Sequence, residues 1–198
     1  MKKFSLIESI VSCNDNLHNT QKFILYPGME FDSLEKWWPD SGMRPTRHEG
    51  IDICYYRESS GSVNQVTPRT AVPAMADGQI TGICEDFLGF SVFVAHPHES
   101  YSCFMSIYAH IIPFPTLETG MNVNMGQVLG RVADTSGRKN RMVCHLHFSL
   151  LGFTYSPPPE VLDWHLIGGS GRKQLIDPLT MIHIDLVEKQ PENPWERI

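Results

Sequence analysis

The sequence lacks any long hydrophobic run. No stretch of its 198 residues approaches the ~20 consecutive apolar residues that a helix needs to span a bilayer. The first residues, MKKFSLIESIVSCND, have a basic start, but Glu8 interrupts the apolar segment after only a few residues. A secretory signal peptide normally has an apolar region of ~7–15 residues. We therefore expect neither a membrane span nor a classical export signal.

Basic residues are in the minority. The chain has 16 Lys and Arg against 22 Asp and Glu, a formal net charge of −6. Proteins that bind nucleic acid usually present a basic face, and anionic membrane surfaces attract basic segments, so neither is expected as a partner. With 41% apolar and 19% charged residues, the composition is that of a folded domain with one buried core.

The cysteines lack the even number and regular spacing of a disulfide framework. There are only five, so at least one must stay unpaired, and unpaired thiols suit a reducing compartment better than an oxidising one. They are Cys13, Cys54, Cys84, Cys103 and Cys144.

Short β-strand patterns dominate the chain and predict a mainly β protein of antiparallel sheets with few short helices. Five segments are rich in β-branched and aromatic residues and punctuated by glycine: GQITGIC, FSVFVAH, SCFMSIYAHI, GQVLGRVADT and CHLHFSLLGF. The 14 prolines leave little room for long helices, and the best helical candidate is MEFDSLEKWW, which ends before Pro39.

The chain divides into an N-terminal extension (1–20), one β-rich domain (21–188) and a short tail (189–198). The polar, turn-rich segment 57–70 is expected to be a loop. A second segment, at about 154–173, contains a triple proline and a Gly-Gly-Ser-Gly stretch. Because long irregular loops in compact domains are usually functional or mobile, we interpret it as an insertion that decorates a site.

Two histidines lie one residue apart in the stretch RMVCHLHFSLL. Residues i and i+2 of a strand point to the same side, so His145 and His147 should share one face while Leu146 and Phe148 point to the core. The pair could share a metal, or one could bind it while the other handles protons. A solvated strand face remains the simpler interpretation of this pattern alone.

A second pair with the same spacing, His96 and His98, is a weaker candidate. Pro97 lies between them and interrupts both the strand hydrogen bonds and the regular alternation of side chains. We expect this pair to form no metal site.

The stretch RHEGIDIC supplies a histidine and a carboxylate four residues apart, His48 and Asp52, with Gly50 between them. Together with one imidazole from another strand they would make a three-ligand zinc site of two nitrogens and one oxygen, with a fourth position open for water. The alternative is a surface histidine and a capping aspartate. His110, in SIYAHI, ends an apolar strand, where a buried histidine bonded to a backbone carbonyl is the usual explanation.

The ordered set of these motifs resembles the catalytic domain of lysostaphin-type (LytM-like) zinc metallopeptidases. HEGID matches the family's His-x-x-x-Asp motif, YAH matches Tyr-x-His, and HLHF matches His-Leu-His-Phe. The connecting segments AVPAMADGQITGI, ETGMNVNMGQVLGRVADTSG and LIDP are also similar, so the likeness covers about residues 40–180. It implies the duplicated hybrid-motif fold of that family.

The resemblance also implies a role for each site residue. His48, Asp52 and His147 would bind Zn²⁺, His145 would be the general base, and His110 would be a second catalytic histidine that stabilises the transition state. Cys54 departs from the family pattern. It would share the face of Asp52 on a regular strand, so it is a rival ligand, although a small hydrophobic role is the better interpretation.

The implied function is a zinc metalloendopeptidase that hydrolyses peptide bonds in the cross-links or stem peptides of bacterial peptidoglycan. Such a substrate places the action in the cell envelope or outside the cell. Two alternatives are a non-catalytic relative that binds the wall or activates another hydrolase, and a sugar-transport phosphocarrier of similar fold with paired histidines. The sequence identifies no protein partner.

Overall fold

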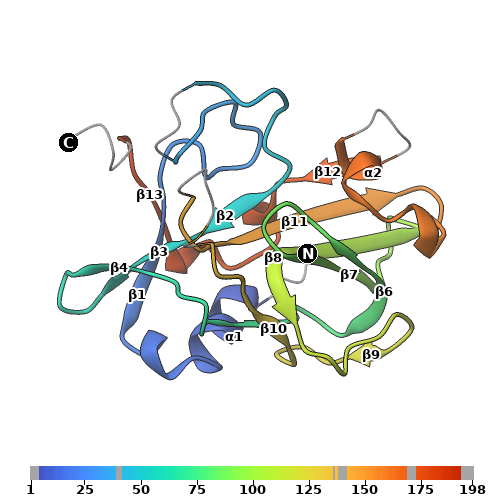
Figure 1. The fold of residues 1–198 in the computed structure, drawn as a ribbon, viewed down its shortest axis with the longest axis horizontal. Helices are drawn as coiled ribbons and strands as arrows, with labels where there is room; N and C mark the ends of the chain where they lie inside the picture. The colour runs from blue at the N-terminus through green and yellow to red at the C-terminus, as the bar shows by residue number, and fades with distance from the viewer. Residues whose placement is uncertain (1–4, 39–41, 136, 138–141, 169–172, 193–198) are drawn as a thin grey trace.

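The structure is a computed structural model. It describes residues 5–38, 42–135, 137, 142–168 and 173–192. Two β-sheets form the framework of the described chain, and their strands run antiparallel with one exception (Figure 1). The prediction of a mainly β protein with antiparallel sheets and few short helices is therefore confirmed.

The larger sheet carries the site. Its continuous path follows the order β12 (Lys173–Ile176), β11 (Leu146–Phe153), β8 (Cys103–Pro113), β7 (Phe90–His96), β6 (Gly78–Glu85) and β9 (Asn122–Val123). Three further strands join this path: β2 (Ile51–Ile53) pairs with β11, β10 (Val128–Val132) pairs with β8, and β5 (Ala71–Pro73) pairs with β10.

The smaller sheet lies beside it and has the order β13 (Val187–Lys189), β1 (Thr20–Leu25), β3 (Tyr55–Glu58) and β4 (Val63–Gln65). Only the β1–β13 pair is parallel among the described strand pairs. The helices are short: α1 (Leu6–Ser12), α2 (Trp164–Gly168), and 3₁₀ turns at Asp15–Leu17, Pro159–Val161, Pro178–Thr180 and Ile184–Leu186.

The central strands β8 and β11 are buried on both faces, which explains their nearly continuous apolar sequence. Alternate residues enter different clusters: Tyr108 and Phe148 pack on one side of the sheet, and Ile107 and Leu151 pack on the other. Helix α1 adds its buried side chains to the first cluster, and α2 adds Ile167 to the second. The strand ends that hold the site are thus fixed by packing on two faces.

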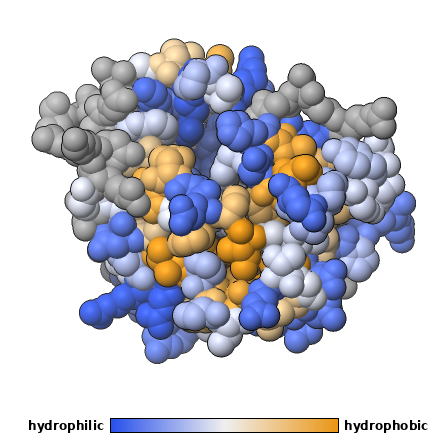
Figure 2. Space-filling view, turned by 45° about the vertical axis from the view of Figure 1, so that its right-hand side comes forward, coloured by the Kyte–Doolittle hydropathy of each residue, from blue (hydrophilic) through white to orange (hydrophobic). Residues whose placement is uncertain are grey.

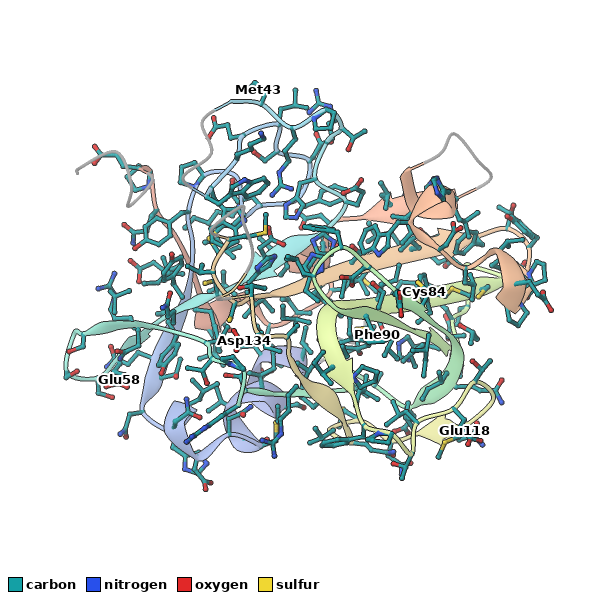
Figure 3. The ribbon with its side chains drawn as sticks, in the orientation of Figure 1. Met43, Glu58, Cys84, Phe90, Glu118 and Asp134 are labelled. Atoms are coloured by element: carbon teal, nitrogen blue, oxygen red, sulfur yellow. The ribbon has the colours of Figure 1, made fainter. Side chains whose placement is uncertain are left out.

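The helix predicted over MEFDSLEKWW is wrong. This segment belongs to the connection between β1 and β2, which arches over one end of the large sheet at the top of Figure 1. Asp32 has a φ of 65°, and its N–H donates to the carbonyl of His48, whose own N–H donates to the carbonyl of Ser33. Those pairings with a distant segment replace the helical hydrogen bonds that local propensity favours. Met43, labelled in Figure 3, stands on the outside of the connection with 61% exposure.

The loop prediction for 57–70 is wrong in part, because Val63–Gln65 forms β4 and pairs with β3. The segment at 154–173 also has structure of its own in its described part, the turn Pro159–Val161 and helix α2. The five strand predictions are confirmed, with β8 running on to Pro113 and β10 ending at Val132. All five cysteines are free thiols. Among the described residues, no helix is long and apolar enough to cross a membrane.

Gly50 lets β2 lie against β11. A Cβ atom built on Gly50 would lie 2.2 Å from the carbonyl oxygen of Phe148 and 2.6 Å from Ser149 Oγ. No side chain fits in that space, so the glycine is required by close backbone approach rather than by its own turn.

We predict that Gly50→Ala lowers the free energy of unfolding by about 1–3 kcal/mol, because the added methyl group forces β2 away from β11. Denaturant unfolding of the purified variant measures this. Gly137→Ala is the matched control, since a Cβ at Gly137 meets no atom within 4 Å. Equal stability of the Gly50→Ala variant and the parent would show that the contact is tolerated.

Candidate metal centre

The pairing of β2 with β11 places two polar side chains opposite each other. Asp52 pairs directly with His147, while Ile51 pairs with Phe148 and Ile53 with Leu146. Because side chains alternate along a strand, the apolar residues enter the core and the aspartate and histidine share the opposite face. Leu146 and Phe148 do belong to the first hydrophobic cluster.

His48 completes a cluster of three potential metal ligands with Asp52 and His147. Asp52 Oδ1 lies 3.1 Å from His48 Nε2 and 2.9 Å from His147 Nδ1, and these two nitrogens are 3.0 Å apart. A tetrahedral ion with bonds of about 2.0–2.1 Å separates its ligand atoms by roughly 3.3 Å. The three donor atoms therefore fit a metal ion after shifts of a few tenths of an ångström.

Each of the three side chains is held by a second contact on the side away from the cluster. His48 Nδ1 lies 2.8 Å from the carbonyl oxygen of Glu30, which can only accept, so Nδ1 carries the proton and Nε2 presents its lone pair. His147 is turned the other way, with Nε2 2.7 Å from Ser149 Oγ and Nδ1 toward the cluster. Contacts of this kind fix the ring orientation and the tautomer of metal-binding histidines.

Asp52 receives two donors on its other oxygen. Trp37 Nε1 donates to Oδ2 at 2.6 Å, and Arg44 Nη2 donates to the same atom at 3.3 Å. Trp37 is 1% exposed, and it comes from the segment that was expected to be a helix. Because both donors contact Oδ2, Oδ1 is the oxygen that faces the two histidines.

The charges of the cluster suit a metal ion. Burial would raise the pKa of Asp52, but the close contacts of its carboxylate with His48, His145 and His147 hold that pKa well below its usual value. Burial lowers the pKa of His147 to about 3, against the opposing effect of Asp52. An ionised carboxylate and a neutral imidazole are the forms in which these side chains bind metals.

The two other histidines of the sequence motifs border this cluster. His145 Nε2 lies 3.9 Å from Asp52 Oδ1, and the ring of His110 lies 5.0 Å from that of His145 and 5.8 Å from that of His147. His145 is 2% exposed and His110 is 4% exposed. The structure thus brings together all five residues that the motifs single out, from three separate segments.

A cavity of about 330 Å³ opens onto these residues. Aromatic side chains from three distant segments form part of its wall: Trp38 before β2, Phe87 between β6 and β7, and Trp164 at the start of α2. The exposed Phe87 packs edge-on against His110, with ring centroids 4.7 Å apart. Figure 2 shows how apolar and hydrophilic patches alternate on one face of the molecule.

The rival ligands do not join the cluster. Cys54 is buried, donates to the carbonyl of Cys144 at 3.3 Å, and packs in the hydrophobic core. His96 contacts the carbonyl of Asp77 and Ser106 Oγ, whereas His98 accepts from the N–H of Ser100. The two rings of the second histidine pair therefore have separate partners, and the absence of a metal site there stays a prediction.

Several residues around the site were not found from the sequence. Ser149 could have been, because it follows His147 by two positions on the same strand face. Trp37, Arg44, Asp86 and Trp164 could not, since only the tertiary structure brings their distant segments to the site. The segment that carries Trp37 was moreover assigned to a helix.

The fold and the cluster define a β-sheet protein with a buried His-Asp-His site that could hold a metal ion. Residues 46–156 match the model of peptidase family M23, so the chain belongs to that family. The resemblance to LytM-type proteins seen in the motifs is confirmed. No curated protein matches the chain.

Solved structures with a similar chain path include two larger proteins and one isolated domain. The solution structure of lysostaphin is 22% identical, with 58% of this chain and 40% of that one covered and a TM-score of 0.38. Csd3 of Helicobacter pylori is 20% identical, with 80% and 39% covered and a TM-score of 0.37. The chain therefore spans less than half the length of either protein. A mutant of the catalytic domain of EnpA, a prophage-encoded M23 protein from Enterococcus faecalis, is 19% identical, with 71% and 97% covered and a TM-score of 0.37.

We predict that Trp37→Phe weakens metal binding by about 10–100-fold, because it removes the donor to Asp52 Oδ2 while an aromatic ring stays in place. Competition with a chelator measures the affinity. Trp38→Phe is the control, since Trp38 lines the cavity but no hydrogen bond joins it to Asp52 among the described contacts. Equal affinities of the two variants would contradict the role given to the indole.

Proposed function

We propose that this protein is a zinc metalloendopeptidase that hydrolyses peptide bonds in bacterial peptidoglycan. The observation that carries the proposal is the buried cluster of His48, Asp52 and His147, with two further histidines beside it and a cavity that opens onto all five. Membership of peptidase family M23 supports peptide hydrolysis as the reaction class.

Zinc fits the ligand set. Two imidazole nitrogens and one carboxylate oxygen, with a fourth position left open, are typical of catalytic zinc sites. Zinc bound there would act as a Lewis acid and make a water-derived nucleophile available at neutral pH. His48, Asp52 and His147 hold the ion in this proposal, and Trp37, Arg44, Glu30 and Ser149 hold those ligands in place.

His145 is the general base in the proposed mechanism. Its Nδ1 lies 2.9 Å from the carbonyl oxygen of Val143, so the proton is on Nδ1 and the lone pair of Nε2 points toward Asp52 and the cavity. Burial lowers the pKa of His145 to about 4, which keeps the ring neutral and able to accept a proton at pH 7. It would take a proton from the attacking water and return it to the leaving amine.

His110 is the second catalytic histidine in the proposed mechanism. Its ring lines the cavity next to His145. Its Nδ1 faces Asp86 and carries a proton, so a second proton on Nε2 would let the charged ring donate to the carbonyl oxygen that gains negative charge during the attack. The two histidines thereby serve different atoms of the scissile bond.

Peptidoglycan peptides are the proposed substrate class. The aromatic side chains in the cavity wall offer apolar surface to a peptide, and the net charge of −6 does not suggest a nucleic acid as the substrate. Glycine-containing bridges and peptides with D-amino acids are the two versions to test. Cleavage of either by the purified protein, followed by mass spectrometry of the fragments, identifies the bond.

Two other functions are less well supported. A non-catalytic binding protein would have no need of an intact three-ligand cluster with both neighbouring histidines. A phosphocarrier needs a histidine that can reach a phosphate donor, but Asp52, a buried carboxylate, lies 2.9 Å from His147 and would repel phosphate. A metal assay and a digest of purified peptidoglycan distinguish these functions from the proposed one.

We predict about one zinc ion per chain in the purified protein, and loss of most of it in His147→Ala, because one of three ligands is removed. Elemental analysis of dialysed protein measures the content. Cys54→Ser is the matched control and should keep its zinc. A zinc content of His147→Ala equal to that of the parent, or a large loss in Cys54→Ser, would refute the ligand assignment.

We predict that His145→Ala keeps its zinc and loses about 10²–10⁴-fold in turnover, because the ligands are intact and only the proton-transferring group is missing. Zinc content and cleavage of a wall peptide should be measured on the same preparations. Zinc loss as complete as in His147→Ala would mean that His145 is a ligand, and the proposed division of roles would fail.

A further inference from the structure

A buried carboxylate that the proposed mechanism does not use lies behind His110. Asp86 sits in the turn between β6 and β7, which Cys84 and Phe90 bracket in Figure 3. Its side chain is 0% exposed and lies 3.0 Å from His110 Nδ1 through Oδ1. Burying a carboxylate away from water costs free energy unless hydrogen-bond donors surround it. The groups that donate to Asp86 therefore indicate what it does.

Five donors surround Asp86. Oδ1 accepts from the N–H groups of Leu88 and Gly89 as well as from the ring of His110. Oδ2 accepts from Ser91 Oγ at 2.8 Å and from the N–H of His110 at 2.9 Å. Burial would raise the pKa of Asp86, but the hydrogen bonds and charge of His110 hold it below its usual value, so the group is ionised and can only accept.

His110 is bound to this carboxylate at two points, the ring and the main chain. It also has a φ of 62°, a conformation that is uncommon for a residue with a side chain and that persists only where the surroundings impose it. The two hydrogen bonds to Asp86 are contacts that can impose it. They hold the backbone and the ring of His110 together, with Nδ1 turned away from the cavity that the ring lines.

The same network reaches a second side chain that lines the cavity. Trp164 Nε1 donates to Ser91 Oγ at 2.9 Å, and the hydroxyl of Ser91 donates in turn to Asp86. The indole of Trp164 also packs edge-on against His147, with ring centroids 5.3 Å apart. One hydrogen-bond network therefore joins Asp86 to His110 directly and to Trp164 through Ser91.

We propose that Asp86 is a positioning residue for the peptidase reaction: it fixes His110 as the Nδ1–H tautomer and leaves Nε2 as the ring atom that meets the substrate. A carboxylate behind the Nδ1–H of a catalytic histidine also compensates the positive charge when Nε2 holds a proton. The kinetic part of this inference rests on the proposed function, whereas the tautomer of His110 does not.

The competing explanation is that Asp86 only closes the β6–β7 turn through Leu88 and Gly89. A double-mutant cycle separates the two explanations, using Asp86→Ala, His110→Ala and the double variant. If Asp86 acts through His110, we expect Asp86→Ala to lower turnover by about 10²-fold in the parent and by less than about 2-fold when His110 is already alanine. Equal losses in both backgrounds would overturn the proposal.

The control for this cycle is Asp77→Ala. Asp77 also accepts a main-chain N–H, that of Met125 at 2.7 Å, but it lines a different cavity. Its turnover should equal that of the parent, and the zinc content of every variant should be unchanged. A similar loss of turnover in Asp77→Ala would assign the effect to general loosening of turns and would contradict a positioning role.

A measurement that needs no activity completes the test. In zinc-loaded protein labelled with ¹⁵N-histidine, correlation spectra show which ring nitrogen of His110 carries the proton. We expect Nδ1–H in the parent, and in Asp86→Ala a loss of that single tautomer. If no peptide is cleaved by the parent, a tautomer change still supports the proposal while the proposed function fails. An unchanged His110 spectrum overturns the proposal whatever the activity.

Asp86→Asn serves if the alanine variant does not fold. It keeps the size of the side chain but supplies one oxygen for five donors, so its NH₂ group must face a main-chain N–H in either orientation. We expect the same change in the spectrum of His110, and a folded variant that keeps the Nδ1–H tautomer with full turnover would contradict the role of the carboxylate.

Discussion

The backbone pairing of β2 with β11 is the constraint on which the site depends. It sets Asp52 opposite His147 and, by the same register, sends their apolar neighbours Ile51 and Phe148 into the core. A shift of one residue would turn the polar pair toward the hydrophobic core and the apolar pair toward the site, so the packing energy of the core also holds the register of the ligands. The absence of a side chain at Gly50 allows the two backbones to approach each other.

Around this pair, each site histidine is oriented by a contact on the nitrogen that faces away from the reaction. Backbone carbonyls hold Nδ1 of His48 and His145, the carboxylate of Asp86 holds Nδ1 of His110, and Ser149 lies against Nε2 of His147. The other nitrogen of each ring is therefore presented to the site before any ligand binds. Such preorganisation spares the protein the cost of reorienting dipoles during the reaction.

Much of this architecture is predictable from sequence because it depends on short-range periodicity. The alternation in CHLHFSLLGF predicts β11 and the shared face of its histidines, and apolar runs predict β6, β7 and β8. The connection before β2 is different. Its local sequence favours a helix, but in the structure Asp32 and Ser33 form backbone hydrogen bonds with His48, and Trp37 donates to Asp52. The contact of Asp86 with His110 cannot be predicted from the sequence either. The two residues are 24 positions apart, and only the folded sheet brings the β6–β7 turn next to His110.

We propose that the cluster of His48, Asp52 and His147 is a zinc site with three protein ligands. It is tested most directly by a crystal structure of the zinc-loaded protein, with anomalous scattering measured on both sides of the zinc absorption edge. The account predicts one strong zinc peak within bonding distance of His48 Nε2, an oxygen of Asp52 and His147 Nδ1, and outside bonding distance of His145, His110 and Cys54. A zinc peak at other residues, or coordination by Cys54 or His145 in place of one of the three, would contradict it.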